Sequence, residues 1–390
     1  MGSRRTGLGF HKIYDVAVVG SGSAGAMAAF CLAKKGVRVA ILEKSTLPRY
    51  KPCGGGIVRK AMQLLPVYVS EIIERECYRV ELNYIPHHLH FSTKRKRPIV
   101  SMTMRDKFDY QLVLATRAAG ADIFSKCQVV DVVSKVDMIE LMTSKGPFRA
   151  RFVVGADGGL SAVAKKSGWR ETRNLIPAIE SEMLVSQEEM DRFCHSARFD
   201  FGLFSGGYGW VFPKKVHLSV GVLSMRKNTV RLNDMMKNYL KALEIDPSKK
   251  SKRYGYLIPV TPRNDAFMKG RVLLAGDAAG FANPITGEGI SFALLSGQTA
   301  AYALLDGAFR KSRVKNIFES EIKKKILPEL HSVHIFAKLV YRYPRLFRLM
   351  LRFHGQKFVE NVTDIETGKT TYRCLATDPL NYLQLFRLWD

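Results

Sequence analysis

Residues 14–44 read YDVAVVGSGSAGAMAAFCLAKKGVRVAILEK, and this stretch decides the fold. Residues 16–19 form a short apolar run that ends at glycine, as a buried parallel strand does. Gly20, Gly22 and Gly25 follow in the spacing G-x-G-x-x-G, which permits a tight turn, close approach of backbone to a pyrophosphate, and close packing of a helix on a strand. The stretch therefore predicts a strand, a glycine turn, a helix and a second strand.

The end of this stretch completes the pattern of a dinucleotide site. Residues 37–42 read as the second strand, and Glu43 follows it, where a carboxylate can accept the ribose hydroxyls. An acid there disfavours a 2′-phosphate, so FAD or NAD fits better than NADP. A glycine turn without a ligand is the structural alternative. A signal peptide or membrane span is excluded, because three glycines and two serines make residues 16–33 poorly lipophilic.

Composition limits the class of protein. The 390 residues are enough for two interlocked domains with an extension, and 46% apolar residues is ordinary for a soluble protein. Six cysteines show neither C-x-x-C pairs nor zinc spacing, which predicts a reduced, cytoplasmic setting and no metal site. The net charge of +26 suggests anionic lipid, a phosphorylated substrate, an acidic electron carrier or nucleic acid as partner. A generally basic proteome is the alternative.

A basic, glycine-rich loop follows the first unit. Residues 48–56 read PRYKPCGGG, and the three glycines after Cys53 let backbone lie flat against a ring or a phosphate. We expect this loop to contact a cofactor. Arg105 begins a predicted helix over residues 105–120, where it meets a phosphate or a ribose, or is an ordinary exposed arginine.

Two further apolar strands end in glycine and an acid. Residues 152–158 read FVVGADG and contain Asp157; residues 271–280 read RVLLAGDAAG and contain Asp277. Ligands of α/β proteins bind at such carboxyl ends of strands, although Asp-Gly is also an ordinary turn pair. The amides of Gly289 and Ile290 begin a helix and suit an electron-rich ring edge. Three such turns are hard to explain as turns that only connect a strand to a helix, without a ligand.

Between these turns, residues 176–256 alternate and are rich in aromatic residues, which predicts an antiparallel sheet. Tyr208, Trp210 and Phe212 share one face, either as core or as the lining of a hydrophobic substrate chamber. Near the C-terminus, helical spacing places Arg342, Arg345, Arg348 and Arg352 on one arc, with apolar residues mainly elsewhere. Such a helix lies on an anionic membrane surface, or packs on the rest of the protein.

Taken together, these motifs resemble the geranylgeranyl reductase family of FAD-dependent oxidoreductases, digeranylgeranylglycerophospholipid reductases included. The matching elements are GSGSAG with Glu43, RYKPCGGG, Arg105, GADG with Ser161, YGWVFP and GDAAGFANPITGEGI. They run in order from residue 14 to about residue 300. Ser205 stands where the family's aromatic motif has proline, which puts the shape of the pocket in doubt.

The resemblance implies a fold of class α/β. It comprises a glutathione-reductase-like FAD domain of the p-hydroxybenzoate hydroxylase type, an antiparallel-sheet substrate domain and a C-terminal helical extension. The expected FAD domain is discontinuous, over residues 12–60, 100–175 and 262–308. The expected substrate domain spans residues 61–99 and 176–261, and the extension spans residues 309–390.

The resemblance also implies an FAD site. Ala24 and Glu43 are expected toward the ADP end, with Arg105 and Val129 nearby, while Cys53, Gly54 and Gly56 approach the flavin. Asp277, Gly289 and Ile290 are expected to hold the ribityl chain and the isoalloxazine ring.

The activity implied by the resemblance is reduction of isolated double bonds in a prenyl chain. The chain is carried by a membrane lipid or a prenyl diphosphate, and hydride comes from reduced flavin. Cys53 is a candidate proton donor, or only a packed small residue. No second glycine fingerprint is present, so electrons are expected from transiently bound NAD(P)H or a ferredoxin-like acidic carrier.

Two other functions share these motifs. A flavin monooxygenase or halogenase has the same FAD turns, and a non-catalytic prenyl-binding carrier has the same fold. A halogenase is expected to carry Trp-x-Trp-x-Ile-Pro, which residues 208–213 only approach. No nucleic-acid partner is expected. The expected location is the cytoplasm, peripheral to the cytoplasmic membrane if the basic helix binds there.

Overall fold

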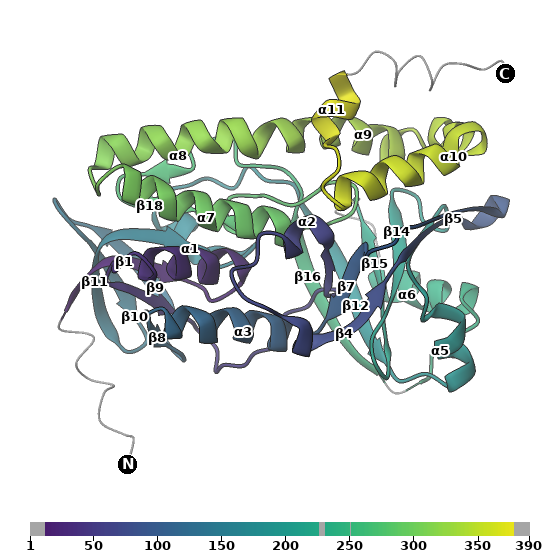
Figure 1. Ribbon diagram of the computed structural model, residues 1–390, viewed down its shortest axis with the longest axis horizontal. Coiled ribbons are helices and arrows are strands. Elements are labelled where there is room, and N and C mark those ends of the chain that lie inside the picture. The colour runs from purple at the N-terminus through teal and green to yellow at the C-terminus, as the bar shows by residue number, and fades with distance from the viewer. Residues whose placement is uncertain (1–11, 226–230, 250, 378–390) are drawn as a thin grey trace.

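The structure of the protein is a computed structural model that describes residues 12–225, 231–249 and 251–377 (Figure 1). Its first unit is the predicted one: β1 (Ile13–Val19), α1 (Ser23–Ala33) and β2 (Val39–Leu42). The two strands pair in parallel, with Val16 opposite Val39. Residues 16–19 of β1 and all of β2 are apolar and buried, as a parallel strand covered on both faces must be. The strand, turn, helix and strand predicted from residues 14–44 are confirmed.

The first sheet has eight strands and carries the three glycine turns. Its order is β17-β18-β11-β1-β2-β8, with β10 joining β9 to β11. The further strands are β8 (Asp122–Phe124), β9 (Val129–Ser134), β10 (Ile139–Thr143), β11 (Gly146–Gly155), β17 (Met268–Lys269) and β18 (Val272–Leu274). Strands β1, β11 and β18 run in parallel. Their carboxyl ends therefore place the turns at Gly20, Gly155 and Gly276 along one edge of the sheet.

The second sheet has seven strands in the order β16-β12-β15-β14-β13-β5-β6. These strands are β5 (Arg79–Tyr84), β6 (Leu89–Lys94), β12 (Leu175–Met183), β13 (Ser196–Phe201), β14 (Gly207–Pro213), β15 (Leu218–Ser224) and β16 (Ser251–Pro259). Five of its pairs are antiparallel, as predicted, but β5 and β13 pair in parallel. Strand β5 comes from the earlier segment, residues 61–99, and runs in the same direction as β13.

Helices cover both sheets. Helices α3 (Arg105–Ala118) and α1 pack together beside the first sheet, and α5 (Gln187–Phe193) and α6 (Leu232–Ala242) cover the outer face of the second. The shorter elements are α2 (Arg59–Met62), α4 (Ala162–Lys166), η2 (Ser70–Ile72), η3 (Ile85–His87) and η4 (Gly276–Ala278). A small third sheet, β3 (Gly56–Val58), β7 (Val100–Thr103) and β4 (Ile73–Cys77), joins the two halves. This small sheet was not predicted from the sequence.

The C-terminal helices form a layer above both sheets (Figure 1). They are α7 (Ile290–Asp306), α8 (Lys311–Lys325), α9 (Leu327–Arg342), α10 (Pro344–Glu366) and α11 (Tyr372–Thr377). Helix α10 packs on β5 and β6, and a break at His354 divides it. Residues 378–390 of the predicted extension lie outside the described residues. Within the described part of the chain, no helix is both long and apolar enough to cross a membrane.

The predicted basic helix near the C-terminus is partly wrong. Arg342 ends α9, and α10 begins at Pro344, so Arg342 lies on a different helix from the other three arginines. Phe347 and Leu351 are buried against the second sheet, whereas other apolar residues of this segment point outward beside the arginines. The segment therefore packs on the protein with one side and presents a mixed apolar and basic surface with the other.

Candidate functional site

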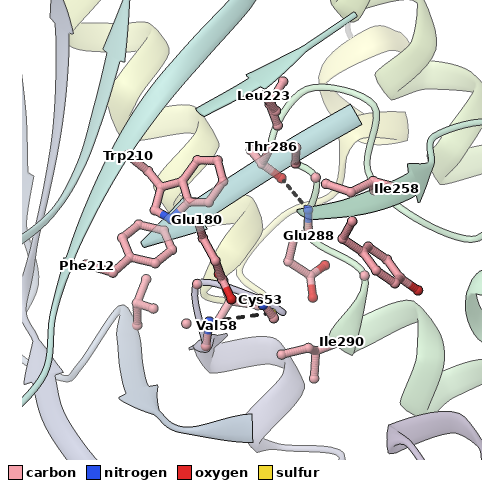
Figure 2. A pocket seen from close by; sticks show the side chains of 18 of the residues that line it. Cys53, Val58, Glu180, Trp210, Phe212, Leu223, Ile258, Thr286, Glu288 and Ile290 are labelled. Atoms are coloured by element: carbon pink, nitrogen blue, oxygen red, sulfur yellow. Dashed lines mark hydrogen bonds between the residues drawn. The ribbon is translucent and has the colours of Figure 1, made fainter. Parts of the chain in front are cut away.

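One large cavity lies where the carboxyl ends of the first sheet meet the inner face of the second (Figure 2). Together with its open mouth, the cavity contains about 1790 Å³ of empty space. The predicted site residues that line it are Gly22, Ala24, Cys53, Gly54, Gly56, Arg105, Tyr208, Trp210, Phe212, Asp277, Gly289 and Ile290. The cavity thus connects the glycine turns with the aromatic strand β14.

The glycine fingerprint forms a cradle at one end of the cavity. A Cβ on Gly20 would lie 2.4 Å from the carbonyl oxygen of Ala156, and a Cβ on Gly25 would lie 2.0 Å from that of Gly20. These two glycines are required for the turn and for the packing of α1. A Cβ on Gly22 would instead meet only the Arg49 guanidinium, at an ordinary contact distance of 3.6 Å. The N-terminus of α1, which has no side-chain cap, faces the cavity there and fits a pyrophosphate.

Two guanidinium groups stand beside this cradle. Arg105 is 4% exposed, so it is not the ordinary surface arginine that the sequence left open. Its Nη2 donates to Asp109 at 2.8 Å and lies 3.4 Å from the Ser23 hydroxyl. Arg49 Nη1 donates to the same aspartate at 3.2 Å. Arg49 and Asp109 were not predicted as site residues from the sequence, although Arg49 belongs to the basic loop at residues 48–56. The two positive charges suit a pyrophosphate.

Glu43 lies at the end of β2, as predicted, but behind the cavity wall. Its Oε2 accepts hydrogen bonds from the amide of Ser21 at 3.0 Å and from Arg49 Nε at 3.1 Å. Burial opposes ionisation, but the charge of Arg49 and these hydrogen bonds hold the pKa of Glu43 below its usual value. Val129, at the start of β9, is buried in the apolar core of the same domain. Neither side chain lines the cavity.

The two strand-end aspartates have different surroundings. Asp157 accepts from the Ser161 hydroxyl at 2.5 Å and from the Val163 amide at 3.0 Å, next to the start of α4. Its carboxylate is thus engaged in turn chemistry, while Ala156 and Gly158 on either side line the cavity. The structure does not bring the Asp157 side chain to the site.

Asp277, by contrast, faces the cavity. Its Oδ2 accepts from Lys51 at 3.3 Å and from the Tyr256 hydroxyl at 2.9 Å. Burial alone would raise the pKa of Asp277, but Lys51 and Tyr256 hold it below its usual value. Next to it, Gly289 precedes α7, whose N-terminus has no side-chain cap. An anionic carboxylate and free amides together suit a polyol chain and a ring oxygen.

The glycine loop at residues 53–56 lies directly against the aromatic strand β14. A Cβ on Gly54 would be 2.7 Å from the Phe212 ring and 2.9 Å from Trp210 Nε1. Behind the loop, the fully buried Lys214 donates to the carbonyl oxygen of Gly54 at 2.6 Å. Burial lowers the pKa of Lys214. Cys53 begins this loop and lines the same cavity as the aromatic wall formed by Trp210 and Phe212.

The far end of the cavity is an apolar chamber. Tyr208 and Trp210 are only 3% and 7% exposed, and both also line this chamber. These side chains are therefore part of the buried core and of the pocket wall at the same time. The remaining apolar lining comes from the second sheet, the small sheet and α10, and includes Val80, Leu82, Ile99, Phe199, Phe201, Leu223, Ile258, Phe358, Val359 and Val362. Such a lining suits a long hydrocarbon chain.

One carboxyl group in the cavity wall was missed by the sequence interpretation. Glu180, on β12, is 3% exposed and accepts from the Cys53 amide at 2.7 Å. Figure 2 shows its side chain reaching toward Cys53. Burial raises the pKa of Glu180 to about 7. The available signal was the alternation of β12, because Ile176 and Ala178 share its buried face and an acid among them is unusual.

Comparison with known sequences supports a flavoprotein. The chain matches the FAD binding domain family over residues 13–305, which is most of its length. It is 27% identical to the chloroplastic geranylgeranyl diphosphate reductase of Oryza sativa, over 89% of this chain and 80% of that protein. It is also 27% identical to digeranylgeranylglycerophospholipid reductase 2 of Methanothermobacter thermautotrophicus, over 84% of this chain and 88% of that one.

Solved structures share the fold. A geranylgeranyl bacteriochlorophyll reductase-like protein of Thermoplasma acidophilum superposes with a TM-score of 0.76 at 20% identity, covering 97% of this chain and 96% of that one. The halogenase PltM gives a TM-score of 0.69 at 18% identity, covering 93% and 86%. The three glycine turns, the cavity and these likenesses converge: this chain belongs to the FAD binding domain family of FAD-dependent oxidoreductases and is similar to its geranylgeranyl reductases.

Proposed function

We propose that the protein saturates isolated C=C bonds of a geranylgeranyl or other prenyl chain, carried by a membrane lipid or a prenyl diphosphate. One observation carries this proposal: the cradle at Gly22 and the apolar chamber at Trp210 belong to one continuous cavity. A hydrocarbon chain in the chamber would then reach a flavin in the cradle. A prenyl-lipid substrate also places the protein in isoprenoid lipid biosynthesis.

The residues present fit FAD. Gly22 leaves room for the pyrophosphate, Arg105 and Arg49 balance its charge, and Asp277 faces the position of a polyol chain. FAD, when bound and reduced, supplies the hydride. An isolated alkene gives no enolate to stabilise, so the chain contributes by holding the bond close and by excluding water. The apolar lining of the chamber performs both tasks.

We propose Cys53 as a proton donor or gate beside the reacting atoms, because it lines the cavity next to the aromatic wall. Cys53→Ala is expected to lower turnover by about tenfold or more, and Cys53→Ser to retain more of it. Turnover is measured with chemically reduced enzyme, and bound FAD is quantified in parallel. Full turnover of Cys53→Ala with normal FAD content would leave Cys53 as a packing residue only.

Two alternatives remain distinguishable. A monooxygenase or halogenase would consume oxygen in step with substrate, and the halogenase fold likeness supports that possibility only at the level of architecture. A non-catalytic prenyl carrier would bind no flavin. We expect a yellow protein that dithionite bleaches and that reduces its substrate under anaerobic conditions. Oxygen uptake coupled to substrate would favour the monooxygenase, and a colourless protein would favour the carrier.

We propose NAD(P)H or a ferredoxin-like carrier as electron donor. The net charge of +26 suits both the phosphates of a nicotinamide and the surface of an acidic protein. Stopped-flow reduction of the bound flavin by each donor at low and high salt would identify it. An acidic protein donor is expected to lose rate steeply as salt rises.

We further propose a cytoplasmic protein that docks peripherally on an anionic membrane through the first half of α10. Here Tyr343, Leu346, Leu349 and Phe353 are each about half exposed, and the exposed Arg345, Arg348 and Arg352 lie among them. The second half of the same helix lines the apolar chamber through Phe358, Val359 and Val362. The prenyl chain of a membrane lipid would then have a short path from the membrane surface at the first half of α10 to the apolar chamber at the second half.

Vesicle flotation tests this docking surface. Replacing Arg345, Arg348 and Arg352 by glutamine is expected to weaken binding to anionic vesicles about 100-fold, at roughly 1 kcal/mol per arginine. The control replaces Lys323, Lys324 and Lys325, which are exposed on α8, by glutamine. It removes the same charge and is expected to weaken binding far less. Equal losses in both variants would show that net charge alone binds the vesicles.

A further inference from the structure

A chain of polar side chains leads from the edge of the second sheet to the cavity wall. His217 Nε2 lies 2.9 Å from Glu182 Oε2, and the Tyr50 hydroxyl lies 3.2 Å from Glu182 Oε1. The same hydroxyl lies 2.7 Å from Glu180 Oε1. The His217 side chain is 16% exposed, so part of the ring reaches solvent, while Nε2, which faces Glu182, is buried. Glu180, at the other end of the chain, lines the cavity.

The Tyr50 hydroxyl lies between the two carboxyl groups. A phenol has one hydrogen to donate, yet its oxygen lies within hydrogen-bond distance of both Glu180 and Glu182. The hydroxyl can donate its hydrogen to either carboxyl group, and two ionised carboxylates beside one phenol would repel each other, which favours a proton on one of them. The Tyr50 ring is fixed in this position by stacking on Tyr254, with ring centroids 4.1 Å apart.

The surroundings identify Glu180 as the protonated group. Burial is the main cause of its raised pKa of about 7, and the charge of Glu182 adds to it. The hydrogen bonds of Tyr50 and the Cys53 amide, with the charge of Lys214, act in the opposite direction. For Glu182, burial also raises the pKa, but hydrogen bonds from His217 and Ser219 outweigh it, and the pKa lies below the usual value. The pair is thus a neutral acid at the cavity and an ionised acid behind it.

We propose that Glu180 holds the proton that completes saturation of the double bond, and that Tyr50, Glu182 and His217 return a proton to it from solvent. The inference rests on the proposed function, because only alkene reduction calls for an acid at this wall. Glu180 is the catalytic residue of this group, since it faces the chamber. Tyr50, Glu182 and His217 act through it.

The step balances. Saturation of one C=C bond adds one hydride and one proton. Bound reduced FAD supplies the hydride and is oxidised by two electrons, which a nicotinamide or ferredoxin-like donor restores. Glu180 releases its O–H proton to the other carbon, directly or through the neighbouring Cys53 thiol, and becomes a carboxylate. His217, protonated from solvent, first gives its proton to the Glu182 carboxylate. Glu182 then passes a proton to the Tyr50 oxygen as the Tyr50 hydroxyl passes its own to Glu180, so that Glu182 ends as a carboxylate and Glu180 as an acid.

The first test measures the proton on Glu180 without any turnover. In FAD-loaded protein labelled with ¹³C at the glutamate carboxyl carbons, one resonance is expected to titrate near pH 7, and Glu180→Gln is expected to remove it. Unperturbed glutamates titrate near about 4.3. The inference is overturned if the resonance lost in Glu180→Gln titrates in that ordinary range.

The second test measures a single turnover of reduced enzyme with a prenyl substrate. Glu180→Gln is expected to slow bond saturation by about 10²-fold or more, with FAD content and the rate of flavin reduction unchanged. In the wild type the rate is expected to fall as pH rises past about 7, because the acid must carry its proton, and Glu180→Gln is expected to remove this dependence. Tyr50→Phe keeps the stack on Tyr254 but breaks the chain, so repeated turnover is expected to slow more than the first turnover.

Matched controls come from an exposed tyrosine–glutamate pair, in which the Tyr78 hydroxyl donates to Glu76 at 2.8 Å. Tyr78→Phe and Glu76→Gln are expected to retain the wild-type rate. Glu288, another carboxyl that lines the cavity, is the competing acid. Loss of the rate in Glu288→Gln but not in Glu180→Gln would overturn the inference while leaving the proposed function intact. A wild-type enzyme that saturates no prenyl chain would contradict both the inference about Glu180 and the proposed function.

Discussion

Replacing Gly22 by alanine is expected to give a folded protein that has lost most of its FAD. The backbone at Gly22, with φ −71° and ψ −178°, accommodates any residue, and the added Cβ would meet no protein atom closer than 3.6 Å. The methyl group would instead occupy the space that a pyrophosphate needs. Overpacking of about 1–3 kcal/mol corresponds to a roughly 5- to 150-fold weaker affinity for FAD.

Gly25→Ala is the matched control for this effect. Its Cβ would lie 2.0 Å from the carbonyl oxygen of Gly20, so the fold itself must shift, and the protein is expected to be destabilised whether or not FAD is present. Unfolding curves and FAD titration of the two apoproteins separate the cases. Wild-type affinity for FAD in Gly22→Ala would show that the cofactor does not approach this turn.

Trp210→Ala is expected to lower the free energy of unfolding by about 3–5 kcal/mol. The indole is 7% exposed and lies so close to β15 that a Cβ on Gly221 would be 1.9 Å from its ring. Gly221→Ala alone is therefore also expected to be destabilising, because the ring must move. In the Trp210→Ala background the added methyl group has room, and most of this cost is expected to vanish.

A second tryptophan provides the control for this double-mutant cycle. Trp169 is 5% exposed and belongs to the core of the first domain, so Trp169→Ala is expected to destabilise by a similar amount. It does not contact Gly221, and Gly221→Ala should keep its full cost in that background. Urea unfolding of all variants measures the coupling. Additive effects of Trp210→Ala and Gly221→Ala would contradict the packing described for the aromatic wall.

Local sequence was sufficient to predict the structure where the residues that act together lie close together in the chain. The glycines at 20, 22 and 25 set the turn, the helix start and the open cradle within six residues, and their positions in the structure are those predicted. The aromatic stripe at Tyr208, Trp210 and Phe212 follows from strand alternation in the same way.

The two aspartates at strand ends show where local sequence fails. Asp157 and Asp277 both follow an apolar strand and a glycine, so sequence pattern treats them alike. The partner of Asp157 is Ser161, four residues away, and the contact closes a local turn. The partner of Asp277 is Lys51, which lies 226 residues away in the sequence. This contact forms only when the basic loop at residues 48–56 packs against the carboxyl end of β18. Only tertiary packing distinguishes a capping acid from a cavity acid.

The polar groups behind the cavity were missed for the same reason. Tyr50 and Glu180 are separated by 130 residues, and Arg49 and Asp109 by 60. Each pair joins a loop to an element of regular structure, and no periodicity within either segment indicates its partner. An acid on the buried face of β12 was visible as an exception to the apolar pattern, but the pattern could not show what faced it.

The most direct test of the account is anaerobic turnover of the reduced, FAD-loaded enzyme with a geranylgeranyl lipid, followed by mass spectrometry of the lipid. The account predicts a product heavier by two hydrogens for each bond reduced, formed in step with reoxidation of the flavin and without oxygen. An unchanged prenyl chain beside a flavin that reoxidises only in oxygen would contradict it.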